Sequence, residues 1–248
     1  MSADFWLWLD TVLMTAGGLA ILAIGKRRTK QEEAHTIYHG IVPIIAACSY
    51  FAMAVAQGAV VLPTADGGSR LFYFARYIDW TFTTPLLLLS LAGTAMHSGH
   101  RRGGLVAGLI LSDVMMILTS LFFGASEVIW IKWTWFLISC IAFLGVYYVM
   151  WVGLLEENRK ETAHVQSDYR RNATILTVLW FAYPVILALS TDGLGSISTE
   201  ASVALIAIID LVSKVAYGLL TTAGMTKIVD EELGSTNAVG HAPQRVAA

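Results

Sequence analysis

The chain has 248 residues, of which 56% are hydrophobic and 14% are charged, and its mean hydropathy is +0.64. Soluble domains carry about 25% charged residues, so this composition excludes an ordinary soluble domain and indicates a protein that crosses a membrane several times. The formal net charge of −2 gives no sign of nucleic-acid binding. The two cysteines, Cys48 and Cys140, lie in apolar runs, which predicts neither a disulfide nor a metal site.

Seven apolar segments are long enough to cross hydrocarbon, which takes about 20 helical residues. They cover residues 5–25, 37–61, 71–95, 104–123, 129–154, 172–190 and 201–226. The first segment lacks the basic flank and cleavage site of a signal peptide, so we expect it to stay as the first helix. The sequence therefore predicts an all-α membrane protein, a seven-transmembrane-helix bundle formed by residues 1–226. Residues 227–248 would form a polar cytoplasmic tail.

Basic residues predict the orientation, because cytoplasmic loops carry an excess of lysine and arginine. Twelve of the 16 basic residues fall in the first, third and fifth loops and in the tail, all on one side of the membrane. They are Lys26, Arg27, Arg28, Lys30, Arg101, Arg102, Arg159, Lys160, Arg170, Arg171, Lys227 and Arg245. We therefore expect the N-terminus outside the cell and the C-terminus in the cytoplasm.

The third segment carries a polar stripe formed by Arg76, Asp79, Thr83 and Ser90. The spacing of these residues places them on one helical face. With a rise of about 1.5 Å per residue, Asp79 and Ser90 lie about 16 Å apart along the axis. A polar stripe can simply pack helices together, but ionisable residues inside a membrane are costly and usually functional.

Aromatic residues recur at helical spacing in the sixth segment, at Trp180 and Tyr183, and Trp80 and Phe136 are candidates to face the same interior. Such residues form either an ordinary packed core or the walls of a cofactor pocket. An ionisable group nearby would favour the pocket.

The seventh segment supplies such a group, because Asp210 and Lys214 stand four residues apart within an apolar run. On a helix both side chains project from the same face. One interpretation is a buried ion pair that only fixes helix packing. The other is a lysine that holds an aldehyde covalently as a Schiff base, with the carboxylate balancing its charge.

These residues together resemble the microbial (type 1) rhodopsins, and among them the bacteriorhodopsin-like proton pumps. The resemblance covers all seven segments in order. The motifs that carry it are Arg76-Tyr77-x-Asp79-Trp80 with Thr83, Thr84 and Pro85, then Trp180-x-x-Tyr183-Pro184, and Asp210-x-x-x-Lys214. The resemblance implies that all-trans retinal is bound to Lys214 as a protonated Schiff base.

The resemblance also implies a role for each site residue. Asp79 would be the primary counterion and proton acceptor, held by Thr83, and Asp210 the second counterion, with Arg76 completing a nearly neutral cluster. A protonated Asp113 would lie near the ring of retinal. The remaining walls of the retinal pocket would be Trp80, Thr84, Met116, Phe136, Trp180 and Tyr183.

The residues at 79, 83 and 90 indicate the subclass. Relatives that pump chloride lack the carboxylate of Asp79, and those that pump sodium carry Asn and Asp at the positions of Asp79 and Thr83. An Asp-Thr-Ser triplet resembles a light-driven outward proton pump that lacks the usual carboxylic proton donor. The expected protein is an ion transporter of the plasma membrane, not an enzyme. Its expected partners are retinal, the lipid bilayer, protons and further copies of this chain in a homo-oligomer.

The groups that release and take up the proton stay open. Asp192 matches one member of the family's release pair, Ser202 replaces the other, and Glu200 is a candidate substitute; alternatively, both acids are solvated loop residues. His39 matches a position that faces Ser90 and is a candidate to conduct or donate the proton, because histidine titrates near neutrality. The alternative is a solvent-facing histidine at a helix end.

Two other functions remain compatible with the sequence. A photosensor that signals through a transducer protein would have similar core residues. A transporter or receptor with a structural ion pair would bind no chromophore.

Overall fold

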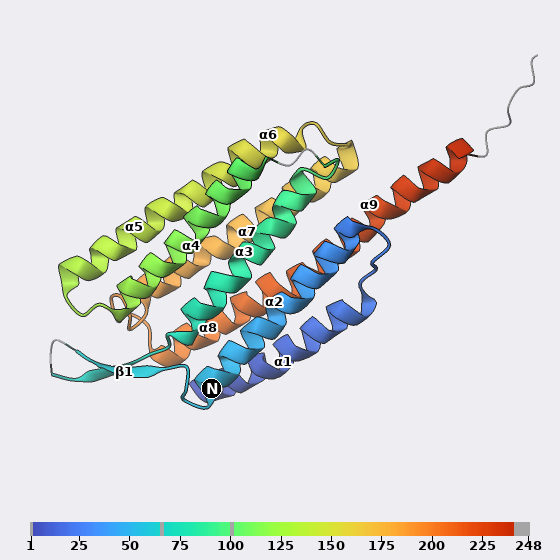
Figure 1. Ribbon diagram of the computed structural model, residues 1–248. Helices are drawn as coiled ribbons and strands as arrows, with labels where there is room; N and C mark the ends of the chain where they lie inside the picture. The colour runs from blue at the N-terminus through green and yellow to red at the C-terminus, as the bar shows by residue number, and fades with distance from the viewer. Residues whose placement is uncertain (1, 65–66, 100–101, 241–248) are drawn as a thin grey trace, which may run out of the picture.

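The chain folds into a bundle of long helices with a short β-hairpin at one end (Figure 1). This computed structural model describes residues 2–64, 67–99 and 102–240, and the side chains of this part through residue 235. Arg101 and Arg245, two of the residues used to predict the orientation, lie outside the described residues, as does the end of the predicted tail.

Each long helix is followed in the chain by the next one of the bundle, and two of these long rods contain a π-helical stretch. Their bounds are α1 Ala3–Ile24, α2 Lys30–Ala54, α3 Ala75–Ala95, α4 Gly103–Ala125, α5 Ile129–Tyr148, η1 Val149–Leu154, α6 Leu155–Asn158, α7 Ala163–Leu189, α8 Thr199–Leu211, η2 Val212–Ala216 and α9 Tyr217–Gly240. The hairpin pairs β1 Val60–Pro63 with β2 Ser69–Phe72 in antiparallel register.

Six of these rods, among the residues that the structure describes, are long and apolar enough to cross a membrane. The seventh rod is α3, 21 residues long, which carries the polar stripe of Arg76, Asp79 and Ser90. Large apolar side chains cover the outside of the bundle, as at Leu111, which is 70% exposed. Such a surface suits lipid rather than water. The predicted seven-helix membrane fold is confirmed.

Two helices begin earlier than their apolar segments predicted, because side-chain caps set the starting points. Thr29 accepts a hydrogen bond from the Glu32 amide at the start of α2, and Thr162 accepts one from the Val165 amide at the start of α7. The first turns of both helices are polar and lie outside the hydrophobic run. A hydropathy argument therefore misses them.

The two ends of the bundle differ in their connections (Figure 1). The β-hairpin and the α4–α5 and α7–α8 connections lie at what we call the hairpin end. The α1–α2, α3–α4 and α6–α7 connections lie at the other, basic end, where α9 projects beyond its neighbours. The first part of the predicted tail is thus a continuation of the last helix.

A glycine lets α1 and α2 pack closely, and a π-helical stretch carries Lys214. A Cβ atom on Gly18 of α1 would approach the backbone oxygen of Gly40 on α2 to 2.8 Å, so the small residue permits close packing of these helices. The π-helical stretch η2 contains Lys214. Such π-bulges occur frequently at functional sites.

Candidate functional site

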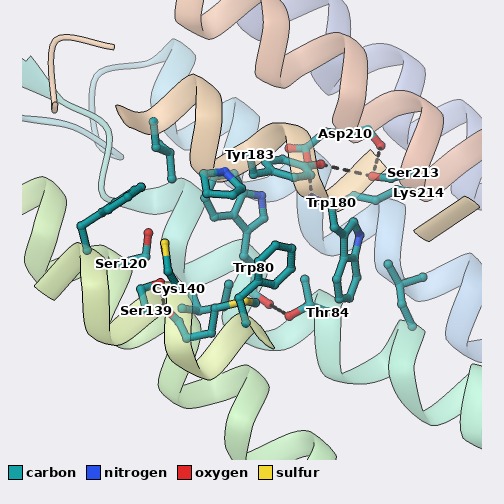
Figure 2. A pocket seen from close by; sticks show the side chains of 17 residues that line it. Trp80, Thr84, Ser120, Ser139, Cys140, Trp180, Tyr183, Asp210, Ser213 and Lys214 are labelled. Atoms are coloured by element: carbon teal, nitrogen blue, oxygen red, sulfur yellow. Dashed lines mark hydrogen bonds and ion pairs between the residues drawn. The ribbon is translucent and has the colours of Figure 1, made fainter. Parts of the chain in front are cut away.

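A cavity lies inside the bundle where α3, α4, α5, α7 and η2 face one another (Figure 2). Its empty space, counted out to the opening, is about 670 Å³. Lys214 and Asp210 lie on one side of the cavity, and Ser139 and Cys140 lie on the other. The other lining residues are mainly apolar or aromatic: Trp80, Thr84, Leu87, Met116, Ile117, Ser120, Phe136, Phe143, Trp180, Tyr183, Pro184, Leu187 and Ser213.

Lys214 is held between two aspartates from different helices. Its Nζ lies 2.5 Å from Oδ2 of Asp79 on α3 and 3.3 Å from Oδ1 of Asp210 on α8. The three side chains are only 1–2% exposed. One cation thus faces two potential anions in a dry environment, where unpaired charges are very costly. The structure thus brings together Asp79, Asp210 and Lys214, the three residues that the sequence singled out.

Two tyrosines hold Asp210 in place. Tyr183 donates a hydrogen bond to Oδ1 at 2.6 Å, and Tyr50 donates one to Oδ2 at 2.8 Å. Both oxygens of Asp210 are therefore stabilised by hydroxyl donors. By contrast, Oδ1 of Asp79 has no partner among the described residues. The two carboxylates thus differ in their hydrogen-bond partners.

Thr84 and Asp113 are joined by a short hydrogen bond between α3 and α4. The Thr84 hydroxyl oxygen lies 2.7 Å from Oδ2 of Asp113 and 2.8 Å from the carbonyl oxygen of Trp80. A hydroxyl carries one proton and cannot donate to both. If it donates to the carbonyl, a protonated Asp113 must donate to it, which agrees with the expected neutral carboxyl. Thr84 lines the cavity directly, and Asp113 lies behind it.

Thr83 and Arg76 lie near Asp79 on α3, where they were expected to hold its carboxylate and to complete its charge cluster. The Thr83 hydroxyl donates to the backbone carbonyl of Asp79 at 2.9 Å. The guanidinium carbon of Arg76 lies 5.3 Å from the ring centroid of Tyr73, and Arg76 forms no ion pair with Asp79 or Asp210 in the described part of the chain. Arg76 is buried, and its Nε has no partner there.

At the hairpin end, Arg70 of β2 binds two acids. It lies 2.5 Å from Asp192 and 2.6 Å from Glu127. Asp192 is buried, so burial raises the pKa of its carboxyl, while Arg76, Arg70 and Lys132 act in the opposite direction. The interpretation of Asp192 as a solvated loop acid is therefore wrong.

Glu200 has a different environment. Its side chain is exposed in the first turn of α8, where Ser202 is buried and donates to the carbonyl of Thr199 at 2.9 Å. The exposed Glu200 carboxyl group thus does not take the buried place of Ser202, where the release pair would have its second acid. Among the described residues, no ion pair joins Glu200 to Arg70.

His39 faces Ser90, as the resemblance implied. Its Nε2 lies 2.8 Å from the Ser90 hydroxyl oxygen, and both side chains are buried. The alternative of a solvent-facing histidine is wrong.

Sequence analysis missed Asp10 and Tyr50. Asp10 on α1 is 1% exposed, and its Oδ2 has no partner among the described residues. An acid in an apolar segment was a signal that could have found it. Tyr50 had no comparable signal, because its partner Asp210 is 160 positions away.

The fold and the site define a class of protein: a seven-helix membrane protein with an interior lysine, paired with aspartates, at an aromatic-lined cavity. Residues 1–228 match the family model described as bacteriorhodopsin-like protein, and the chain belongs to this family. Membership implies a retinal chromophore. The buried amine beside an apolar cavity fits that group, because an aldehyde condenses with an amine and a polyene requires apolar walls.

Individual relatives agree with this assignment. The chain is 37% identical over 221 residues to a bacteriorhodopsin of Haloterrigena sp. (strain arg-4), covering 88% of this chain and 86% of the relative. The crystal structure of thermophilic rhodopsin from Rubrobacter xylanophilus is similar with a TM-score of 0.82 and 36% identity, over 90% of this chain and 95% of the other. The light-driven proton pump rhodopsin of Coccomyxa subellipsoidea gives a TM-score of 0.83 and 31% identity, over 89% and 96%.

Proposed function

We propose that this protein is a light-driven outward proton pump, with all-trans retinal bound to Lys214 as a protonated Schiff base. The observation that carries the proposal is the 2.5 Å contact between Lys214 Nζ and Asp79, beside an apolar cavity. Retinal would supply light absorption and a change of shape that alters the proton affinity of the Lys214 nitrogen. The protein is thus an ion transporter of the plasma membrane, not an enzyme.

Asp79 is the proposed acceptor of the proton. In this structure its Oδ2 faces the free amine of Lys214 and would be the nearest carboxylate to the same nitrogen once retinal is bound. Asp210 keeps its negative charge, because Tyr50 and Tyr183 donate to both of its oxygens. Loss of the proton from the nitrogen is thereby balanced by neutralisation of Asp79 alone.

The walls of the cavity hold the chromophore and exclude water. Trp80 and Tyr183 pack edge to face with ring centroids 5.1 Å apart, which fixes one wall. Met116, Phe136 and Trp180 complete the apolar lining. In such a dry site, Asp79 and Asp210 are the ion-pair partners that stabilise the charge on Lys214.

Release is proposed to occur toward the hairpin end. Arg76 lies three residues before Asp79 on α3 and can respond to its loss of charge. Asp192, paired with Arg70, is the proposed release group. This assignment places the hairpin end outside the cell and the basic end in the cytoplasm.

Reprotonation is proposed to come from the basic end through His39 and Ser90, because Ser90 itself cannot donate a proton near neutral pH. Residues 1–226 would form the retinal-binding domain and residues 227–248 a cytoplasmic extension. We also propose that the protein forms a homo-oligomer in the lipid bilayer.

Illumination of cells that express the protein with retinal tests the function. A pump acidifies the medium during illumination, and a protonophore abolishes the signal. A photosensor, the competing proposal, would give no acidification and a photocycle that lasts seconds. Absence of acidification from a coloured protein would refute the pump.

A further inference from the structure

Three buried histidines lie between Ser90 and the surface of the basic end. His35 and His39 stand one turn apart on α2, and His97 follows the end of α3. Their exposed fractions are 4%, 0% and 7%. A buried polar side chain costs free energy unless it is hydrogen-bonded, so the position and the partners of each ring require an explanation.

The innermost ring is that of His39. Its Nε2 lies 2.8 Å from the Ser90 hydroxyl oxygen, and its ring packs edge to face on Tyr217 with centroids 5.6 Å apart. The ring of His35 follows at a centroid distance of 6.0 Å. The two imidazoles are thus neighbours on the same face of α2.

The middle ring, His35, has partners that fix its tautomer. Its Nδ1 lies 3.1 Å from the carbonyl oxygen of Gln31, which can only accept, so Nδ1 carries the proton. Its Nε2 lies 3.0 Å from the Thr94 hydroxyl oxygen, which also lies 3.3 Å from the carbonyl oxygen of Ser90. When the ring is neutral, Nε2 accepts the hydroxyl proton of Thr94 in place of the Ser90 carbonyl. Thr94 stands four residues after Ser90 on the same helix.

The outermost ring reaches the surface. His97 Nε2 lies 2.8 Å from Oε1 of Glu232 on α9, and the Glu232 side chain is 52% exposed. The Nδ1 atoms of His97 and His39 are buried without a partner among the described residues. Each of these rings therefore has a second nitrogen that can exchange a proton after rotation of the ring or through a bridging water.

We propose that Glu232, His97, His35 and His39 form a proton relay from the basic-end surface to Ser90. A proton taken from water at Glu232 passes to His97 and, through water, to Nε2 of His35, whose Nδ1 proton stays hydrogen-bonded to the Gln31 carbonyl. The same Nε2 then gives the proton up toward Thr94 and His39, so that His35 returns to its starting tautomer. No net charge remains after one passage, and the relay replaces the missing carboxylic donor. The inference rests on the proposed function, since it concerns the return of the proton after each cycle.

Flash photolysis of the full chain with retinal bound tests the relay through the rate at which the dark state recovers. We expect His35→Gln and His39→Gln to slow recovery at least about tenfold, less than the roughly 10²–10⁴-fold of a positioned proton-transfer group, because water can partly take over. His97→Gln and Glu232→Gln should slow it about threefold or more, because water can partly replace groups near the surface.

The chain offers a matched control pair at the same end. His164 Nδ1 lies 2.7 Å from Glu231 Oε2, but both side chains are more exposed than His97. His164→Gln and Glu231→Gln should leave recovery within about twofold of the wild type. Asp168, a buried acid paired with Arg171 and Asn172, is the rival donor. Slowing by Asp168→Asn with no slowing by His35→Gln would overturn the relay.

A second measurement does not depend on turnover. Nitrogen-15 NMR of the wild-type histidines in the dark should find His35 neutral with its proton on Nδ1. A proton on Nε2, or a doubly protonated His35, would contradict the relay. Recovery slowed by His39→Gln alone would also overturn it and leave the pump intact, whereas a wild type that does not acidify the medium would refute the pump itself.

Discussion

The two halves of the bundle on either side of Lys214 are built from different chemistry. Toward the hairpin end stand acids held by cations and tyrosines: Asp79 at Lys214, Asp210 at Tyr50 and Tyr183, and Asp192 at Arg70. Toward the basic end, the residues that lead to Ser90 are His39, His35 and Thr94.

This difference follows from the location of the buried cation. A carboxylate can stay ionised in a dry interior only beside a positive charge, which Lys214 supplies to Asp79 and Asp210. Next to Ser90, the buried groups are the rings of His39 and His35 and the hydroxyl of Thr94, which cost less to bury than an unpaired charge. Asp168, a buried acid of this half, is paired with Arg171. One half is thus suited to accept a proton from the nitrogen of Lys214, and the other to deliver one.

Removal of the Lys214 amine, which lies between the two halves, has the largest expected effect. Lys214→Ala should abolish the visible colour of the protein with retinal, because no other amine opens into the cavity among the described residues. Absorption spectra of the purified protein measure this. Lys132→Ala is the matched control, since Lys132 is also a buried lysine but does not line the cavity. Retained colour in Lys214→Ala would refute the assignment.

Replacement of Ser90 by a carboxylic acid makes the delivering half resemble the accepting half. In Ser90→Asp, the new carboxyl group would stand beside His39 and could donate a proton directly. We expect recovery of the dark state to be about tenfold faster. Flash photolysis measures the rate, and Ser90→Ala, which should not be faster, serves as the control.

The tyrosines of the accepting half should contribute to stability through Asp210. Tyr183→Phe and Tyr50→Phe each remove one hydrogen bond to a buried carboxylate, which is worth about 1.5–3 kcal/mol. Both variants should therefore unfold at lower temperature, by similar amounts. Thermal unfolding in detergent measures the change, and unchanged transitions in both variants would show that Asp210 does not need these donors.

The smallest effect is expected at Asp192 and depends on pH. Burial raises the pKa of Asp192, so the folded protein binds this proton more tightly than the unfolded chain does. The resulting stabilisation is complete below the unfolded pKa of about 3.9 and is lost as pH rises through the folded pKa. The difference in unfolding temperature, wild type minus Asp192→Asn, should therefore increase as pH falls. A difference independent of pH would contradict this.

The ionisable residues of the membrane segments show what the sequence could predict. Asp79, Asp210 and Lys214 stand out because charged groups inside apolar helices are rare and costly, and the helix period then places them on faces that meet. Asp10 obeyed the same rule and could have been found. Arg70 could not, because its contact with Asp192 depends on the hairpin that β1 and β2 form.

The uptake side was less predictable, for a physical reason. His35 and His97 lie at the polar ends of helices, where histidines are commonly solvated, and nothing local distinguishes them from His164. Only the packing of α2, α3 and α9 around them buries their rings. Contacts over such sequence distances come from tertiary structure and not from helical periodicity.

The central claim is that the Lys214 nitrogen gives its proton to Asp79, and infrared difference spectroscopy under illumination tests it most directly. Protonation of a buried aspartate creates a carboxylic C=O stretching band that a carboxylate lacks. The account predicts that this band appears in the wild type as the nitrogen loses its proton, and that it is absent in Asp79→Asn. A band that persists unchanged in Asp79→Asn would contradict the account.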